Sequence, residues 1–239
     1  MNDFNESTVV SRETTKRLIN DIRDLRKSPL QSEGIYYKHD ETNILLGYAY
    51  ICGPKDSIYF GGNYFYKFQF PYDYPHRPPV VSFMTVDGKT RFHPNMYRNG
   101  KICLSILNTW RGDQWTGCQS IRSILLTILS VLDNNPLLHE PGFTELHKDC
   151  NSYNKIIKYK NIDFSINKIV LNKVSKLSFY VDLFRDEISF QFKKNKDDNL
   201  AIIESLKNCR IETVTTSIYN LNVQIDWASV YSDFISIKI

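Results

Sequence analysis

The sequence predicts an α+β fold in which one helix precedes an antiparallel sheet and further helices follow it. Three observations support this prediction: an amphipathic helical pattern near the start of the chain, closely spaced strand patterns joined by short turns, and strong helical patterns after them. The chain has 239 residues, of which 42% are hydrophobic and 23% charged, a composition typical of a folded globular protein. Its length favours one core domain with an extension.

The first predicted helix spans residues 11–27. Leu18, Ile22 and Leu25 recur at helical spacing, and Pro29 follows shortly after and stops the helix. The opposite side carries a row of positive charges, called here the basic stripe: Arg12, Lys16, Arg23 and Lys27. Residues 1–10, which precede the helix, are expected to form a polar tail.

Four strand-like segments follow, near residues 35–38, 44–51, 64–70 and 80–84. In the third of them, aromatic residues alternate with their neighbours at the two-residue period of a strand. Gly61-Gly62-Asn63 is a turn signal before this strand. The short connections favour an antiparallel meander, because parallel strands would need long crossovers.

Residues 87–116 show little regular periodicity, and a loop of this length inside a compact domain is usually functional. A strong amphipathic pattern then predicts the central packing helix, which ends before residues 133–136. Its apolar residues recur at helical spacing: Ile121, Ile124, Leu125, Ile128 and Leu132.

After about residue 141 the composition shifts towards Lys, Asn, Ile and Ser. Helices are predicted at 153–169, 179–192 and 226–237, and the charged segment 193–199 is interpreted as an exposed loop. High usage of Ile, Asn and Lys is typical of an AT-rich genome, such as that of a virus or a protist.

Charge and hydropathy argue against several classes of protein. The formal net charge is +4, and Lys and Arg are interspersed with Asp and Glu, which argues against a nucleic-acid-binding protein. The longest apolar stretch, residues 121–132, contains Arg122 and is too short to span a bilayer, and the first residues carry no apolar signal segment. A cytoplasmic or nuclear location, in a host cell if the protein is viral, and no membrane partner are therefore expected.

The five cysteines argue for free thiols. They form an odd set without a close pair, which argues against a disulfide framework and against a structural zinc site, so that no metal is expected: Cys52, Cys103, Cys118, Cys150 and Cys209. Free thiols are typical of a reducing compartment, and one of them can be catalytic.

The most informative string is His93-Pro94-Asn95, followed eight positions after the asparagine by Cys103 within Gly-Lys-Ile-Cys-Leu. This string resembles the hallmark of the ubiquitin-conjugating enzyme family. Residues 72–79 resemble the proline loop of the family, and Gln114-Trp115 its tryptophan loop. The order of these motifs supports the resemblance as strongly as any one of them.

The resemblance covers about residues 12–143 and implies the UBC fold, with a catalytic core at 11–158 and a mainly helical C-terminal extension at 159–239. Within the family, the strings 103–110 and 140–143 look most like the large branch represented by conjugating enzyme Z.

The resemblance also implies an activity. Cys103 would accept ubiquitin or a ubiquitin-like protein from an activating enzyme as a thioester and pass it to an acceptor amine, usually a lysine, with or without a ligase. A thiol suits this chemistry because it is both a nucleophile and a leaving group. ATP is used by the activating enzyme, and no cofactor is expected to bind this chain.

Asn95 is the candidate donor that stabilises negative charge on the carbonyl oxygen during transfer. It can also serve as a turn residue after Pro94, a role compatible with the first. His93 is interpreted as structural, since its ring can hold the loop that presents Asn95 through a backbone hydrogen bond.

Two departures from the family pattern concern acidic residues. Many members have one two positions after the cysteine, where this chain has Ser105. A second, which orients or desolvates the attacking lysine, is common near the position of Leu138, and His139 or Glu140 could substitute for it. Lysine selectivity and the intrinsic discharge rate therefore depend on this region.

Partner surfaces follow from the same resemblance. The basic stripe would meet the acidic ubiquitin-fold part of an activating enzyme, although a solvated helix face explains it equally well. His76 and Trp115 lie in the loops that would bind a ligase, and Trp115 could instead belong to the core.

Two other functions agree less well with the sequence. A cysteine hydrolase would need a histidine base and an orienting partner around Cys103, and no recognised hydrolase pattern surrounds it. A non-catalytic variant of the same fold would lack the cysteine, which this chain retains.

Overall fold

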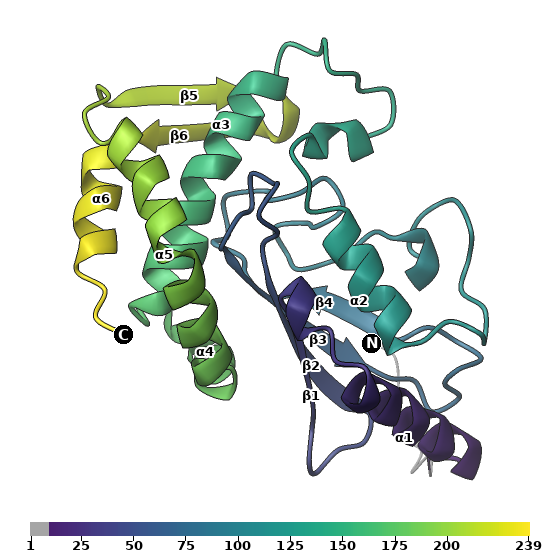
Figure 1. Ribbon diagram of the computed structural model, residues 1–239. Helices are drawn as coiled ribbons and strands as arrows, with labels where there is room; N and C mark the ends of the chain where they lie inside the picture. The colour runs from purple at the N-terminus through teal and green to yellow at the C-terminus, as the bar shows by residue number, and fades with distance from the viewer. Residues whose placement is uncertain (1–9) are drawn as a thin grey trace.

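A computed structural model describes residues 10–239, so nearly all of the predicted polar tail lies outside the described residues. The helices and strands follow in this order (Figure 1): α1 Arg12–Lys27, β1 Ile35–His39, β2 Leu46–Cys52, β3 Asn63–Gln69, β4 Val80–Phe83, α2 Ile121–Ser130, α3 Cys150–Lys160, α4 Ser178–Leu183, α5 Arg185–Leu206, β5 Glu212–Thr216, β6 Leu221–Ile225 and α6 Trp227–Ile235. The predicted α+β class is confirmed.

Helix α1 begins where the sequence predicts it. The side chain of Ser11 accepts a hydrogen bond from the Thr14 backbone N–H, which caps the first turn. Leu18 is fully buried, and Asp21 on the same side accepts hydrogen bonds from Arg17 and from the Tyr74 hydroxyl. The bond from Tyr74 joins the helix to the proline-rich loop.

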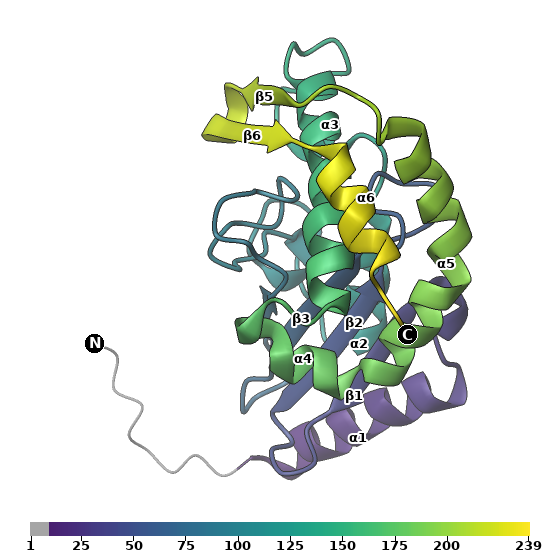
Figure 2. The ribbon, with the colours of Figure 1, turned by 90° about the vertical axis from the view of Figure 1, so that its left-hand side faces the viewer.

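The first four strands form one antiparallel sheet in the order β1-β2-β3-β4, so the predicted meander is confirmed. Helices α1 and α2 cover one face of this sheet, and the helices after residue 150 cover the other (Figures 1 and 2). Strand β3 is consequently buried on both sides: Phe65 stacks on Tyr180 and Phe184 of the C-terminal helices, while Phe68 contacts Tyr37. The face of the sheet opposite α1 and α2 is thus shielded from solvent, because the C-terminal extension covers it.

The predicted irregular loop and central helix are also present. Between β4 and α2, only Ser105–Leu107 forms a helical turn among the described residues. Helix α2 starts with a capping box in which Ser120 and Ser123 satisfy each other's backbone N–H groups. Its apolar side is buried in the core as predicted: Ile121, Ile124, Leu125 and Ile128.

The C-terminal region contains the three predicted helical regions and differs in detail. Helix α3 continues as a π-helix through residues 161–168, and the second region is divided at Phe184 into α4 and α5. The predicted exposed loop at 193–199 is wrong, because these residues lie inside α5. The charged side chains lie on the solvent side of this helix, whereas Asn199 is buried. A run of charged residues is typical both of an exposed helix face and of a loop, so the sequence pattern alone does not decide between them.

The hairpin of β5 and β6 was not predicted, although both strands show the β-branched content and two-residue burial period of a half-exposed strand. Residues 158 and 159, the predicted division between core and extension, lie in continuous helix, and the division stays a prediction. Within residues 10–239, every helix is too short or too polar to cross a bilayer.

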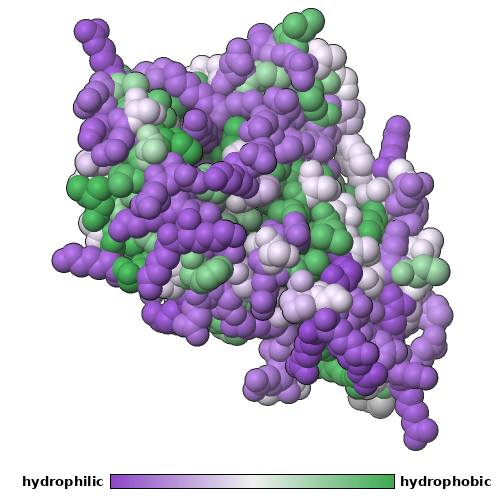
Figure 3. Space-filling view, in the orientation of Figure 1, coloured by the Kyte–Doolittle hydropathy of each residue, from purple (hydrophilic) through white to green (hydrophobic). Residues whose placement is uncertain are grey.

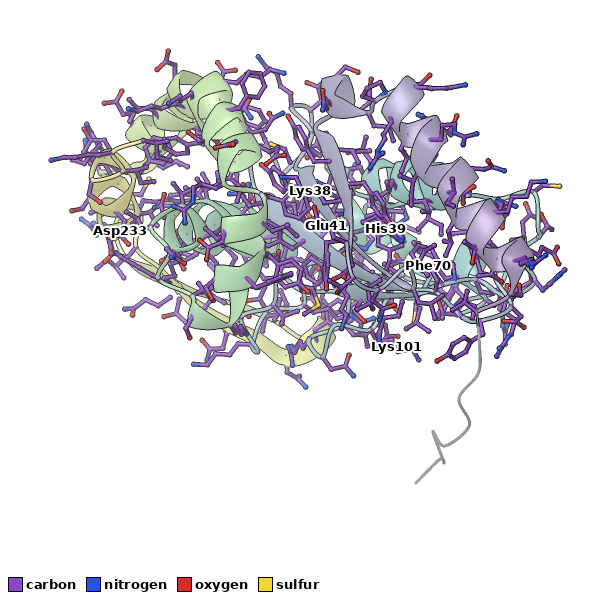
Figure 4. The ribbon with its side chains drawn as sticks, turned by 90° about the horizontal axis from the view of Figure 1, so that it is seen from below. Lys38, His39, Glu41, Phe70, Lys101 and Asp233 are labelled. Atoms are coloured by element: carbon purple, nitrogen blue, oxygen red, sulfur yellow. The ribbon has the colours of Figure 1, made fainter. Side chains whose placement is uncertain are left out.

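The extension is fastened to the edge of the sheet at β1. Lys38 Nζ lies 2.8 Å from a Glu187 carboxylate oxygen and donates to the Leu183 carbonyl at 2.7 Å. Figure 4 shows Lys38 on the side of the C-terminal helices and Phe70 on the side of α1. The extension is therefore attached directly to the sheet of the core.

Candidate active site

Cys103 follows a tight turn that is bonded to strand β4. Gly100 N–H donates to the Tyr97 carbonyl, and Phe83 N–H of β4 donates to the Gly100 carbonyl at 2.8 Å. Gly100 has a φ of +88°, and a Cβ atom there would lie 2.8 Å from the Phe83 carbonyl oxygen, so the turn requires glycine. Cys103 N–H then donates to the Asn95 carbonyl at 2.9 Å. The eight-residue spacing thus brings asparagine and cysteine together.

Asn95 and Cys103 are joined a second time through a side chain. The Asn95 Nδ2 amide donates to the Cys103 carbonyl at 2.6 Å, and Asn95 Oδ1 is buried without a hydrogen-bond partner among the described residues. The amide group therefore lies directly beside the cysteine. Its predicted role as a donor to a reacting oxygen stays a proposal.

His93 is completely buried, and its Nδ1 accepts a hydrogen bond from Asn95 N–H at 3.0 Å. This is the loop-holding contact expected from the sequence, and it puts the ring proton on Nε2. Burial away from water, and next the neighbouring His139 ring at 5.0 Å, lower the pKa of His93 to about 3. The ring is therefore neutral at ordinary pH, which suits a structural role and not that of a general base.

The low pKa of His93 predicts a loss of stability in acid. In the unfolded chain the imidazole binds a proton below its ordinary pKa of about 6.5, whereas the folded chain binds none until about pH 3. Between these values this residue lowers the free energy of unfolding by about 1.4 kcal/mol per pH unit as the pH falls. Urea unfolding of the wild type at several pH values measures the slope.

The matched variant is His93→Gln, whose amide oxygen can still accept the Asn95 N–H and does not titrate. Its free energy of unfolding should depend less steeply on pH below about 6.5 than that of the wild type. Equal slopes would contradict the assignment of this pH dependence to His93. Asp133, His139 and Arg91 also lie near the ring, and all three side chains are retained in the variant.

A shallow pocket surrounds Cys103, which is itself only 4% exposed. Residues from four stretches of the chain line it: Arg91, Pro94, Asn95, Tyr97, Cys103, Trp110, His139, Glu140 and Pro141. Trp110 is 41% exposed beside this pocket. The sequence reasoning did not single out Arg91, Tyr97 or Trp110 as site residues, although all three lie in the irregular stretch that it marked as functional.

The two departures from the family pattern are visible around this pocket. Ser105 begins the short helical turn after the cysteine and packs against Gly112, where a Cβ atom would lie 3.1 Å from the Ser105 Cβ. Leu138 is 41% exposed and does not line the pocket, whereas His139 and Glu140 do. Glu140 is the one carboxylate among the residues that line the pocket.

A hydrolase would place a histidine on the cysteine sulfur. His139 does bond to a carboxylate, with Nε2 2.8 Å from Asp133 Oδ2. Across residues 10–239, however, no hydrogen bond joins either His139 or His93 to the Cys103 sulfur. The nucleophile-base contact of a hydrolase is thus absent from the described part of the chain.

The other cysteines lie outside the pocket. Cys52 is buried in β2, where burial raises the pKa of its thiol to about 11. Cys118 and Cys209 are exposed, and Cys150 is half-buried. Among the described residues, no group of three His, Cys, Asp or Glu side chains could hold a metal ion.

The predicted partner residues take different positions. All four residues of the basic stripe are exposed on α1. His76 is exposed, with Nε2 3.6 Å from a Glu13 carboxylate oxygen. Trp115 is only 8% exposed and donates through Nε1 to the Pro75 carbonyl, so its ring joins the two loops and is largely unavailable to a partner.

Fold and site together define a class of protein: a four-stranded meander with two helices on one face, and an asparagine hydrogen-bonded to a cysteine on an irregular loop. The sequence model of the ubiquitin-conjugating enzyme family matches residues 17–161, more than half of the chain. The chain therefore belongs to the ubiquitin-conjugating enzyme family, and its expected UBC fold is confirmed.

Similar proteins indicate which branch of the family the chain resembles. The chain is 39% identical to ubiquitin-conjugating enzyme E2 Z of Xenopus tropicalis over 166 residues, which cover 68% of this chain and 52% of that protein. It is 42% identical to the E2 Z of Homo sapiens over 153 residues, or 63% of this chain and 43% of that protein. The expected likeness to the Z branch is confirmed, and the chain spans about half the length of these relatives.

Two further proteins are similar. A probable ubiquitin-conjugating enzyme of Acanthamoeba polyphaga mimivirus is 30% identical over 187 residues, which cover 72% of this chain and 13% of that protein. The structure of human ubiquitin-conjugating enzyme E2 G1 is 30% identical, covers 52% of this chain and 97% of that chain, and gives a TM-score of 0.45.

Proposed function

We propose that this chain accepts ubiquitin, or a ubiquitin-like protein, as a thioester on Cys103 and transfers it to an acceptor amine, usually a substrate lysine. The observation that supports this most directly is the pair of hydrogen bonds between Asn95 and Cys103, which holds an amide donor against the cysteine backbone in the pocket. The membership of the ubiquitin-conjugating enzyme family adds independent support.

Loading is an exchange between two thioesters. The Cys103 thiolate attacks the carbonyl carbon of the thioester on the activating enzyme, and that enzyme's cysteine leaves with the electron pair of the broken carbon-sulfur bond. The two thioesters are nearly equal in energy, and a thiol is sufficiently nucleophilic near neutral pH that no dedicated base is required. The position of His93, buried and bonded to a backbone N–H, agrees with such a mechanism.

Discharge makes an amide and needs more help. The acceptor amine attacks the thioester carbonyl carbon, negative charge builds up on the carbonyl oxygen, and the carbon-sulfur bond then breaks with its electrons on Cys103. A positioned amide donor stabilises that charge in a site from which water is largely excluded. Asn95 is the residue whose amide lies at Cys103.

The partners of this reaction are an activating enzyme, a protein substrate and a ubiquitin ligase. We place the ligase at the loops of His76 and Trp115 and the activating enzyme at the basic stripe. ATP is consumed by the activating enzyme, this chain carries no cofactor, and the reaction takes place in the cytoplasm or the nucleus.

The proposed function is tested by incubating the 239-residue chain with an activating enzyme, ATP and ubiquitin. The expected product is an adduct of the two proteins that disappears on treatment with a thiol. Ubiquitin-like proteins with their own activating enzymes are the parallel arms. If none of these pairs gives a thiol-sensitive adduct, the proposed function is wrong.

The basic stripe carries a separate prediction about encounter with the activating enzyme. Hydrophilic residues predominate at the lower right of Figure 3, where α1 lies. Lys16 and Arg23 are exposed residues of this helix. Replacing both by glutamate should slow loading by about tenfold at low ionic strength, because charge complementarity mainly raises the rate of association. The loading rate is measured at several salt concentrations, and the difference should shrink as salt screens the charges.

The matched control changes the same net charge elsewhere. Lys193 and Lys196 are exposed on α5, on the opposite face of the sheet, and their double replacement by glutamate should leave the loading rate unchanged. An equal loss in both double variants would mean that only net charge matters and that α1 is not the contact surface.

A further inference from the structure

The turn that joins β5 to β6 reaches from the C-terminal extension to the rim of the Cys103 pocket. It consists of residues 217–220, and Tyr219 occupies it with a φ of +58°, a region that a bulky side chain rarely adopts. Such a conformation is retained only when surrounding contacts hold it, and it is often found at functional sites. The surrounding contacts of Tyr219 must therefore hold this backbone conformation in place.

The Tyr219 side chain contacts two residues that line the pocket. Its hydroxyl donates a hydrogen bond to Glu140 Oε2. The centroid of its ring lies 4.3 Å from the guanidinium carbon of Arg91, and the centroid of the Tyr97 ring lies 3.7 Å from the same carbon. Arg98 also donates to the Tyr219 carbonyl. Tyr219 does not itself line the pocket, but it contacts side chains that do.

The turn itself is held in place by the start of α3. Asp149 is buried, and its Oδ2 accepts hydrogen bonds from the Ser217 hydroxyl at 2.6 Å and from Ile218 N–H at 2.8 Å. Lys155 of α3 pairs with Glu212 of β5 at 2.7 Å. The hairpin can therefore carry Tyr219 at a defined position.

Glu140 is the group on which Tyr219 would act. It is half-buried, and its second oxygen, Oε1, makes no hydrogen bond or ion pair with the residues that the structure describes. Burial, followed by the hydrogen bond to Glu140, raises the pKa of Tyr219, so its hydroxyl keeps its proton at neutral pH. A carboxylate with one oxygen fixed and the other free is suited to binding a cation.

We propose that Tyr219 is a positioning residue that holds the Glu140 carboxylate at the rim of the Cys103 pocket, where Glu140 binds and orients the acceptor amine. This inference rests on the proposed function and adds to it a role for the C-terminal hairpin. It also gives the pocket a carboxylate at Glu140, although Ser105 and Leu138 occupy the two positions where many family members have an acidic residue.

The step that Glu140 assists is the attack on the thioester. The acceptor arrives as an ammonium ion, the carboxylate binds it near the sulfur, and loss of one proton to solvent frees the nitrogen lone pair. Nitrogen then forms a bond to the carbonyl carbon, the carbon-sulfur bond breaks with its electrons on sulfur, and a further proton passes from nitrogen to the departing thiolate. Glu140 is unchanged at the end.

The test compares the discharge of a preloaded Cys103 thioester to free lysine and to β-mercaptoethanol, with the wild type, Tyr219→Phe, Glu140→Gln and the double variant. Tyr219→Phe keeps the ring and should slow discharge to lysine by about tenfold, the rate equivalent of one charge-assisted hydrogen bond. Glu140→Gln should slow it at least as much. The double variant should be no slower than Glu140→Gln alone, because the two residues act as one unit.

Discharge to the thiol should not be slowed in any of these variants, since the attacking thiolate has no ammonium group for Glu140 to bind. A general distortion of the pocket would slow both acceptors, and that result would overturn the proposal, as would wild-type discharge by Tyr219→Phe. The control is Tyr48→Phe, which removes a hydroxyl that donates to Asp40 at 3.3 Å; neither residue lines the Cys103 pocket. Normal loading in every variant separates a failure of this inference from a failure of the proposed function.

Discussion

Replacing Cys103 by serine is expected to abolish the thiol-sensitive adduct completely. A serine hydroxyl is a far weaker nucleophile than a thiol near neutral pH, and among residues 10–239 neither His93 nor His139 is hydrogen-bonded to the side chain at position 103 to activate it. Any adduct that forms should be an oxyester, which resists thiols and yields to base. The measurement is the adduct yield in the loading reaction, before and after treatment with a thiol.

The other cysteines supply matched controls for this substitution. Cys118→Ser and Cys209→Ser remove exposed thiols away from the pocket and should load as the wild type does. Cys52 is buried with its thiol pKa raised to about 11 by that burial, so almost no thiolate is present there at neutral pH. A thiol-sensitive adduct that survives in Cys103→Ser would place the nucleophile elsewhere and contradict the proposed function.

Replacing Asn95 by alanine should slow discharge to lysine by about a hundredfold while the thioester still forms, since the loss of one oxyanion donor typically has a cost of this size. Loading should suffer less, because a thiolate is both a strong nucleophile and a good leaving group in the exchange between two thioesters. In the structure, Nδ2 donates to the Cys103 carbonyl, and one of its two N–H groups suffices for this bond. The second is available to the reacting oxygen.

Single-turnover discharge and the rate of loading are measured on the same preparations of Asn95→Ala. The control is Asn99→Ala, which removes an exposed asparagine of the same loop whose side chain accepts a hydrogen bond from Lys101 N–H. It should leave discharge unchanged. Equal losses of loading and discharge in Asn95→Ala would indicate that the side chain only shapes the loop, as a turn residue would.

Local patterns predicted the sheet and the first helices correctly because each has a signal within a few residues. Ser11 caps α1, Ser120 caps α2, and the short turns between strands leave only an antiparallel order. The prediction of a loop at 193–199 was wrong because this segment has no such local signal. A charged face is compatible with a helix or a loop, and the choice depends on what Asn199 packs against.

The sequence by itself indicated the fold class through its local patterns, and the resemblance of the string from His93 to Cys103 to a family hallmark indicated the candidate nucleophile and its asparagine. The structure adds that two hydrogen bonds join Asn95 to Cys103. Only the tertiary structure decided what surrounds them. Tyr219 and Glu140 are 79 residues apart, and no periodicity or motif links residues at that separation. Their meeting depends on how the hairpin packs against α3, which is a property of the assembled core and not of any local segment.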